Sequence, residues 1–145
     1  MLVAVINGPN LNLLGQREPH LYGTTTSESL EAAMKERGER LGVSVEWFQS
    51  NHEGELVEAV QGLRQRVDGA VVNPAAFTHT SWALRDAFLA AEVPFVEVHL
   101  SNVFGREAER RQSLLADLAH GFIAGFGTRG YFLALDGLID ILREK

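Results

Sequence analysis

The sequence predicts an α/β fold in which a parallel sheet of five strands is covered by helices on both faces. Short apolar runs typical of buried strands alternate along the chain with segments whose apolar residues recur at helical spacing. Such alternation gives a parallel sheet, and right-handed crossovers make it a doubly wound sandwich. We expect strands at residues 2–6, 43–48, 69–72, 94–98 and 121–126, each followed by a helix.

Helix boundaries follow from capping residues and from proline. Either Thr78 or Thr80 can cap the third helix, which we expect to run to about Glu92. Pro94 then blocks its continuation, because proline clashes with the preceding helical turn. The last helix is expected at about residues 131–143. Two pairs have the spacing of a capping box ahead of the first and second helices, Thr25 with Glu28 and Ser50 with Glu53.

The composition indicates a single globular domain spanning residues 1–145. Apolar residues make up 46% of the chain, enough to build a core at this length. There is no cysteine, which excludes disulfides, thiolate metal ligands and a cysteine nucleophile. The first residues contain neither a basic region nor an apolar run long enough for a signal peptide or a membrane span. We therefore expect a cytoplasmic protein without a membrane partner.

The net charge of −6 argues against a nucleic-acid partner, because nucleic-acid-binding proteins usually carry a basic face. The chain offers one basic cluster, formed by Arg106, Arg110 and Arg111. Two interpretations stay open for this cluster. It is either a solvated helix face or a local anion site that draws a small acidic substrate to an otherwise acidic protein.

The long loop at residues 7–23 indicates a functional segment. Loops of about seventeen residues without regular structure are usually functional in a compact domain. A phenol such as Tyr22 is a poor base at neutral pH, although Arg17 can stabilise it as a phenolate. Five glycine and proline residues in the loop predict that it closes over a ligand. The side chains with useful chemistry are Asn7, Asn10, Asn12, Arg17, Glu18, His20 and Tyr22.

Polar residues also follow the other strands, where doubly wound sheets bind their ligands. Glu97 and His99 lie two apart on the fourth strand, so their side chains point to the same face. The carboxylate can orient the imidazole and suit it to donate a proton, or the pair is purely structural. His79 lies near a helix start, where backbone N–H groups hold anions or hydroxyls, or it is a surface residue. The loops concerned are 7–23, 49–52, 73–79, 99–106 and 127–130.

Neither a metal nor a nucleotide cofactor is indicated by the sequence. The histidines at positions 20, 52, 79, 99 and 120 include no pair with metal-binding spacing. Residues 125–130 (GFGTRG) match neither GxGxxG nor a P-loop. Close packing between a strand and a helix is the preferred explanation for these glycines.

Several long motifs together resemble the type II 3-dehydroquinate dehydratase family. Residues 7–23 (NGPNLNLLGQREPHLYG) are similar to its signature loop, and blocks 49–54, 73–87, 97–107 and 125–135 match in the same order. The resemblance implies a flavodoxin-like sheet with strand order 2-1-3-4-5. It implies a lyase of the shikimate pathway of aromatic amino acid biosynthesis that dehydrates 3-dehydroquinate to 3-dehydroshikimate through an enolate. No cofactor, metal or Schiff base is implied, and the family forms trimers that assemble into dodecamers.

The resemblance also implies roles for individual residues. Tyr22, as a phenolate supported by Arg17, removes the C2 proton, and Asn10 holds a water that stabilises the enolate. His99, held by Glu97, protonates the departing C1 hydroxyl. The substrate-binding groups are Asn73, His79, Asp86 from a neighbouring subunit, the backbone amides of Leu100 and Ser101, and Arg110.

Two parts of the chain keep a second interpretation. From spacing alone Asp86 is a solvated partner for Arg85 or for a neighbouring base. It lies about two turns, roughly 10 Å, beyond His79 along the helix, which is too far for a short carboxylate to reach the site of its own chain. The chain departs from the family pattern mainly after Arg110, where residues 111–117 (RQSLLAD) replace a segment close to RHSYLSP. This departure concerns the local helix end and an inter-subunit contact. The alternative from another class is a non-catalytic flavodoxin-like module that binds a small anion or a flavin, and the lack of a phosphate loop disfavours flavin.

Overall fold

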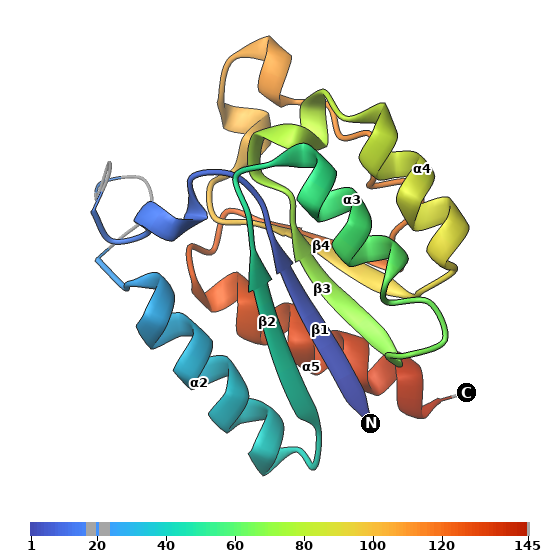
Figure 1. Cartoon of the computed structure of the whole chain (residues 1–145). Helices are drawn as coiled ribbons and strands as arrows, with labels where there is room; N and C mark the ends of the chain where they lie inside the picture. The colour runs from blue at the N-terminus through green and yellow to red at the C-terminus, as the bar shows by residue number, and fades with distance from the viewer. Residues whose placement is uncertain (17–19, 21–23, 145) are drawn as a thin grey trace.

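The computed structural model describes residues 1–16, 20 and 24–144 and contains a parallel sheet in the order β2-β1-β3-β4-β5 (Figure 1). All neighbouring strands in this sheet are parallel. The predicted doubly wound α/β sheet with order 2-1-3-4-5 is confirmed. The strands are β1 (Leu2–Asn7), β2 (Ser44–Gln49), β3 (Gly69–Asn73), β4 (Phe95–His99) and β5 (Gly121–Ala124).

Helices cover both faces of this sheet (Figure 1). α2 (Ser27–Arg40) and α5 (Arg129–Arg143) pack on one face, and α3 (Glu53–Gln61) and α4 (Trp82–Ala91) pack on the other. The expectation of a helix after every strand is wrong for β4, because residues 100–120 lead to β5 without an α-helix. The apolar residues at helical spacing in that connection, Leu115, Leu118 and Ala119, span little more than one turn, which is too short for an α-helix that covers a sheet. Short 3₁₀ helices lie in the connections: η1 (Leu11–Leu13), η2 (Ala75–His79), η3 (Val103–Gly105) and η4 (Ala108–Arg110).

The core has two layers, because successive side chains of a strand point to opposite faces of the sheet. In β1, Val3 and Val5 pack with α2 and α5, whereas Ala4 and Ile6 pack with α3 and α4. The neighbouring central strand β3 is buried throughout its length. The apolar runs of β1 and β3 are therefore explained by cover on both faces.

The helix caps lie at other residues than the sequence predicts. α2 is capped by Thr26, whose hydroxyl accepts the Ser29 N–H at 3.1 Å. α4 is capped by Ser81, whose hydroxyl accepts the Leu84 N–H at 2.9 Å. Several hydroxyl residues precede each helix, and the chain direction decides which of them reaches the first-turn amides. The predicted caps Thr25, Ser50, Thr78 and Thr80 do not take this role.

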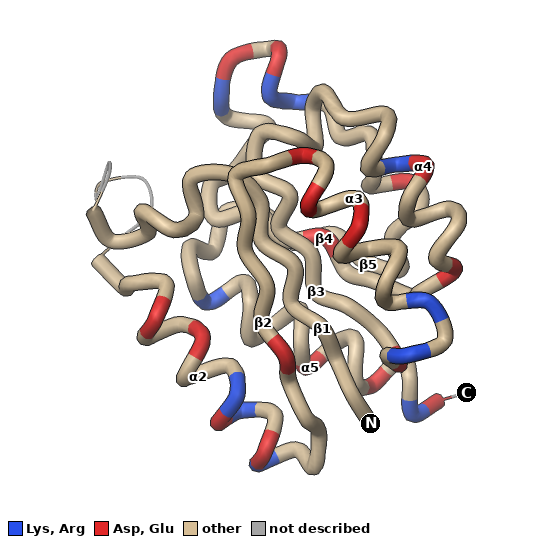
Figure 2. The backbone as a smooth tube through the Cα atoms, in the orientation of Figure 1, with Lys and Arg blue, Asp and Glu red and all other residues tan. Residues whose placement is uncertain are grey.

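Charged residues lie mainly on the helices and connections, and the sheet carries few of them (Figure 2). Arg37 of α2 binds Asp136 of α5 through its Nε and Nη2 groups, which links the two helices on one face. In the part of the chain that the structure describes, none of the helices has the length and apolar character needed to cross a membrane.

The first loop approaches the end of β3 closely at Gly8. The Gly8 N–H donates to the Asn73 carbonyl at 2.8 Å. A Cβ atom at position 8 would lie 2.3 Å from the Pro74 carbonyl oxygen, well inside van der Waals contact. Glycine therefore allows the segments after β1 and β3 to lie side by side.

We expect Gly8→Ala to lower the free energy of unfolding by roughly 1–3 kcal/mol, because the added methyl group forces two backbone segments apart. The matched control is Gly137→Ala on α5, where a Cβ would meet nothing within 4 Å. There the same substitution should raise the free energy of unfolding by up to about 1 kcal/mol. Urea unfolding followed by circular dichroism measures both values, and equal stability of the two variants would contradict the packing argument.

Candidate active site

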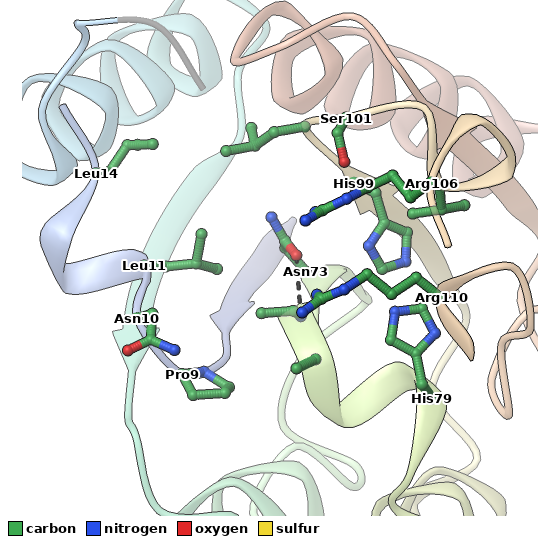
Figure 3. A pocket seen from close by; sticks show the side chains of 14 residues that line it. Pro9, Asn10, Leu11, Leu14, Asn73, His79, His99, Ser101, Arg106 and Arg110 are labelled. Atoms are coloured by element: carbon green, nitrogen blue, oxygen red, sulfur yellow. Dashed lines mark hydrogen bonds between the residues drawn. The ribbon is translucent and has the colours of Figure 1, made fainter. Parts of the chain in front are cut away.

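A pocket opens at the carboxyl ends of β1, β3 and β4, where sheets of this kind bind ligands. Its empty volume is about 780 Å³, counting the open mouth. Figure 3 shows side chains from the first loop, from η2 and from the chain after β4 arranged around this space. The lining residues are Pro9, Asn10, Leu11, Leu14, Asn73, Ala75, Ala76, His79, His99, Leu100, Ser101, Val103, Arg106 and Arg110.

Most of the predicted site residues meet in this pocket. Glu97 lies beside His99 and is fully buried. Asp86 is exposed on α4 and does not line the pocket of its own chain. Arg17 and Tyr22 lie outside the described residues. The predicted residues that line the pocket are Asn10, Asn73, His79, His99, Leu100, Ser101 and Arg110.

Two lining residues adopt left-handed backbone conformations that non-glycine residues seldom take. Asn10 has φ 70° and Ala75 has φ 52°. Each is held by an asparagine side chain: the Asn51 Oδ1 accepts the Asn10 N–H at 2.9 Å, and the Asn73 Oδ1 accepts the Ala75 N–H at 3.1 Å. Unfavourable backbone conformations persist where surrounding contacts fix them, and they concentrate at functional sites.

His99 and Glu97 form a buried pair at the end of β4. Nε2 of His99 is hydrogen-bonded to Oε2 of Glu97, and the His99 side chain borders the pocket. Because Nε2 is engaged by the carboxylate, Nδ1 is the ring nitrogen available to a ligand. A carboxylate in this position orients the ring and stabilises an imidazolium, so the pair can deliver a proton into the pocket.

His79 is fixed by the connection that follows β4. Its Nδ1 lies 2.6 Å from the Gln112 carbonyl oxygen. Since a carbonyl only accepts hydrogen bonds, Nδ1 carries the proton and Nε2 of the neutral ring is an acceptor. The rings of His79 and His99 lie with centroids 6.4 Å apart and planes 20° apart. The two histidines therefore present one ring nitrogen each to a ligand, Nε2 of His79 and Nδ1 of His99.

Asn73 is oriented by a buried network that the sequence did not indicate. Its Nδ2 donates to the Tyr131 hydroxyl at 3.0 Å, and that hydroxyl donates to Oδ1 of Asn7 at 2.6 Å. Burial raises the pKa of Tyr131 well above its ordinary value, with the hydrogen bond from Asn73 acting in the opposite direction. The network fixes which edge of the Asn73 amide faces which partner, and it leaves the second Nδ2 hydrogen for a ligand.

Two arginines give the pocket a positive wall. The side chains of Arg106 and Arg110 extend toward Asn73 (Figure 3). Arg110 is hydrogen-bonded to Glu107, whose pKa is lowered by a backbone hydrogen bond and by this guanidinium. The pocket is therefore suited to an anion, which supports the second interpretation of the basic cluster. Arg106 was not predicted as a site residue individually, although its place beside Arg110 in that cluster was the available signal.

Arg85, the local partner considered for Asp86, makes its hydrogen bonds with other groups. Its pKa is raised mainly by the hydrogen bond with Asp117, and the charge of Asp86 helps to raise it. The Arg85 guanidinium binds both carboxylate oxygens of Asp117, at 2.6 and 3.0 Å. It also donates to the Leu114 carbonyl at 2.7 Å, so α4 is attached to the connection after β4.

Within the described residues no three histidine, aspartate or glutamate side chains gather as metal ligands do.

Comparison with known proteins points to one family. The family model described as "Dehydroquinase class II" matches residues 1–139. The chain is 52% identical to the 3-dehydroquinate dehydratase of Prochlorococcus marinus, covering 100% of this chain and 97% of that one. It is 54% identical to catabolic 3-dehydroquinase 1 of Aspergillus terreus, covering 98% and 93%. The crystal structure of the type II dehydroquinase from Propionibacterium acnes superimposes with a TM-score of 0.91 at 41% identity, covering 96% of each chain.

We expect Tyr131→Phe to lower the free energy of unfolding by about 1–3 kcal/mol near neutral pH, because Asn7 and Asn73 lose a buried partner. An unfolded tyrosine ionises near pH 10. The folded protein retains this proton to higher pH, since the pKa of Tyr131 is raised. Stability from Tyr131 is therefore complete below about pH 10 and declines above it. Urea unfolding of both proteins should show the difference shrinking above that pH, and a constant difference would contradict the assignment.

Proposed function

The chain belongs to the class II dehydroquinase family, and we propose how its pocket performs the dehydration of 3-dehydroquinate to 3-dehydroshikimate. The enzyme is a carbon–oxygen lyase of the shikimate pathway. The observation that carries the proposal is the buried Glu97–His99 pair beside a pocket with a positive wall. The reaction removes a C2 proton, forms an enolate and expels the C1 hydroxyl as water. It therefore needs a base, a group that stabilises the enolate oxygen and an acid.

His99 is the general acid in this proposal. The protonated ring gives the proton on Nδ1 to the departing C1 hydroxyl and becomes neutral. Before this transfer, Glu97 holds Nε2 and stabilises the imidazolium. The support is geometric, since His99 both borders the pocket and contacts a fully buried carboxylate.

Tyr22 is the base, with Arg17 stabilising its phenolate. The assignment rests on the match of the first loop to the family motif. The chain has two tyrosines, and Tyr131 is unsuited to the role because burial raises its pKa. Asn10 holds the water that stabilises the enolate oxygen.

The substrate carboxylate is held by Asn73 and by the backbone amides of Leu100 and Ser101, and the ring hydroxyls by His79 and Arg110. These residues line one pocket. Because the pocket contains two arginines, it attracts the substrate anion to a chain whose net charge is −6.

The proposed chemistry uses no metal, cofactor or Schiff base. The lysines of the chain are Lys35 and Lys145. Lys35 lies on α2, where its Nζ binds Glu31 at 2.7 Å, and it does not line the pocket. Lys145 lies outside the described residues.

The proposed assembly is a cytoplasmic homo-oligomer of trimers that build a dodecamer, with Asp86 completing a neighbour's site. The support is the outer face of α4. Trp82 and Leu89 are 65% and 52% exposed there, and with Asp86 they follow the spacing of one helical face. Large apolar side chains gathered on one helix face suit burial against another subunit.

We expect Tyr22→Phe to lower kcat by roughly 10²–10⁴, the range for loss of a positioned acid–base group. The measurement is the absorbance of the conjugated enone of the product, with and without EDTA, and circular dichroism confirms that the variant folds. The parent enzyme should keep its rate in EDTA. Near-parental turnover of Tyr22→Phe would rule out Tyr22 as the base. If the parent enzyme lost its turnover in EDTA and a divalent ion restored it, the metal-free mechanism would be wrong.

We expect Asp86→Ala and Arg110→Ala to complement each other when their subunits are mixed. Each homogeneous variant should bind substrate weakly. In a randomly mixed trimer roughly one site in four combines an intact Arg110 with an intact Asp86 from its neighbour, so activity should partly return. Light scattering under assay conditions gives the oligomeric state. A fully active monomer, or mixing without any gain, would remove the shared site.

A further inference from the structure

The carboxylate of Glu97 is buried and receives hydroxyl groups from two other segments. The Thr78 hydroxyl donates to Oε2 at 2.7 Å. The Ser113 hydroxyl lies 2.8 Å from Oε1 and 3.0 Å from Oε2. A carboxylate without contact to water stays charged only where such donors stabilise it. Thr78 was expected as a helix cap, and Ser113 was not singled out from the sequence.

The hydrogen bonds that Ser113 accepts restrict where its hydroxyl proton can point. Its Oγ accepts the N–H groups of Leu115 and Ala116, each at 3.0 Å. A hydroxyl has two acceptor lone pairs and one proton, so both lone pairs are occupied by backbone amides. The proton must then point to Glu97 or to Thr78, whose Oγ1 lies 2.9 Å away. Oε1 of Glu97, at 2.8 Å, is the nearest acceptor, and we assign the Ser113 proton to the carboxylate.

The segment around Ser113 is itself anchored on both sides of the site. The Gln112 carbonyl holds His79, and the Leu114 N–H donates to the Thr78 carbonyl at 2.8 Å. Leu115 is fully buried in the core under α3 and α4. The segment that departs from the family pattern thus fixes Ser113 in place and contacts both histidines of the pocket, one directly and one through Glu97.

We propose that Ser113 is a positioning residue for the general acid, acting through Glu97 to keep Nε2 of His99 engaged and Nδ1 turned toward the substrate. The inference rests on the proposed roles of Glu97 and His99. Ser113 does not line the substrate pocket. Its hydroxyl therefore affects departure of the C1 hydroxyl, and it affects neither substrate binding nor removal of the C2 proton.

The test compares Ser113→Ala with Ser50→Ala. Ser50 is a matched control, because its buried hydroxyl also donates to a carboxylate, Glu55, and accepts a backbone amide, that of His52, at 2.9 Å. We expect Ser113→Ala to lower kcat about 10- to 100-fold, as for loss of one hydrogen bond to a charged group, with KM changed less than about twofold. Exchange of the C2 hydrogen with solvent should continue near the parental rate. Ser113→Thr, which keeps the hydroxyl, should recover most of kcat, and Ser50→Ala should match the parent.

A second measurement is independent of turnover. The ring N–H proton of His99, identified in NMR spectra by its loss in His99→Ala, should shift in Ser113→Ala and not in Ser50→Ala. An unchanged resonance or an unchanged kcat overturns the role of Ser113, as does an equal fall in C2 exchange and dehydration. If the parent enzyme does not dehydrate 3-dehydroquinate, the proposed function fails instead, and the resonance alone then decides whether Ser113 positions the ring.

Discussion

The burial of the Glu97 carboxylate is the constraint on which the arrangement of the site depends. A charge removed from water is tolerated only with several hydrogen bonds in good geometry. Here the donors come from β4, from η2 and from the connection after β4, through His99, Thr78 and Ser113. Movement of any one of these segments removes one of the three donors of the buried carboxylate. The free energy that stabilises the fold at this edge therefore also fixes the geometry of the proposed acid.

A second buried network holds the other half of the pocket. Tyr131 at the start of α5 joins Asn7 of β1 to Asn73 of β3, and Gly8 lets the two strand ends approach. In both networks a buried side chain supports the residue that borders the pocket. In the described part of the chain no buried side-chain nitrogen or oxygen lacks a hydrogen-bond partner. Because these buried polar groups are all hydrogen-bonded, the inner wall of the pocket is rigid enough to hold catalytic groups at fixed distances.

The sequence by itself determined the fold class and the edge of the sheet at which the site lies. Apolar runs with the lengths of strands, separated by helical periodicity, are local signals, and general rules of handedness turn them into a parallel sheet. Those rules place Asn73 and His99 at the carboxyl edge of the sheet before any contact is known. The motif blocks added the strand order, the reaction and most of the pocket residues, because whole segments carry information that single positions lack.

Only the tertiary structure decided which polar side chains support these residues. Thr78 has the sequence context of a helix cap, yet its hydroxyl serves Glu97 because Ser81 lies better placed for the α4 amides. Tyr131 and Asn7 are 124 residues apart in sequence and meet in the core. The chain after β4 replaces the expected helix with an irregular connection that holds Ser113. Such contacts depend on the distance between segments remote in sequence, and no periodicity or local propensity encodes that distance.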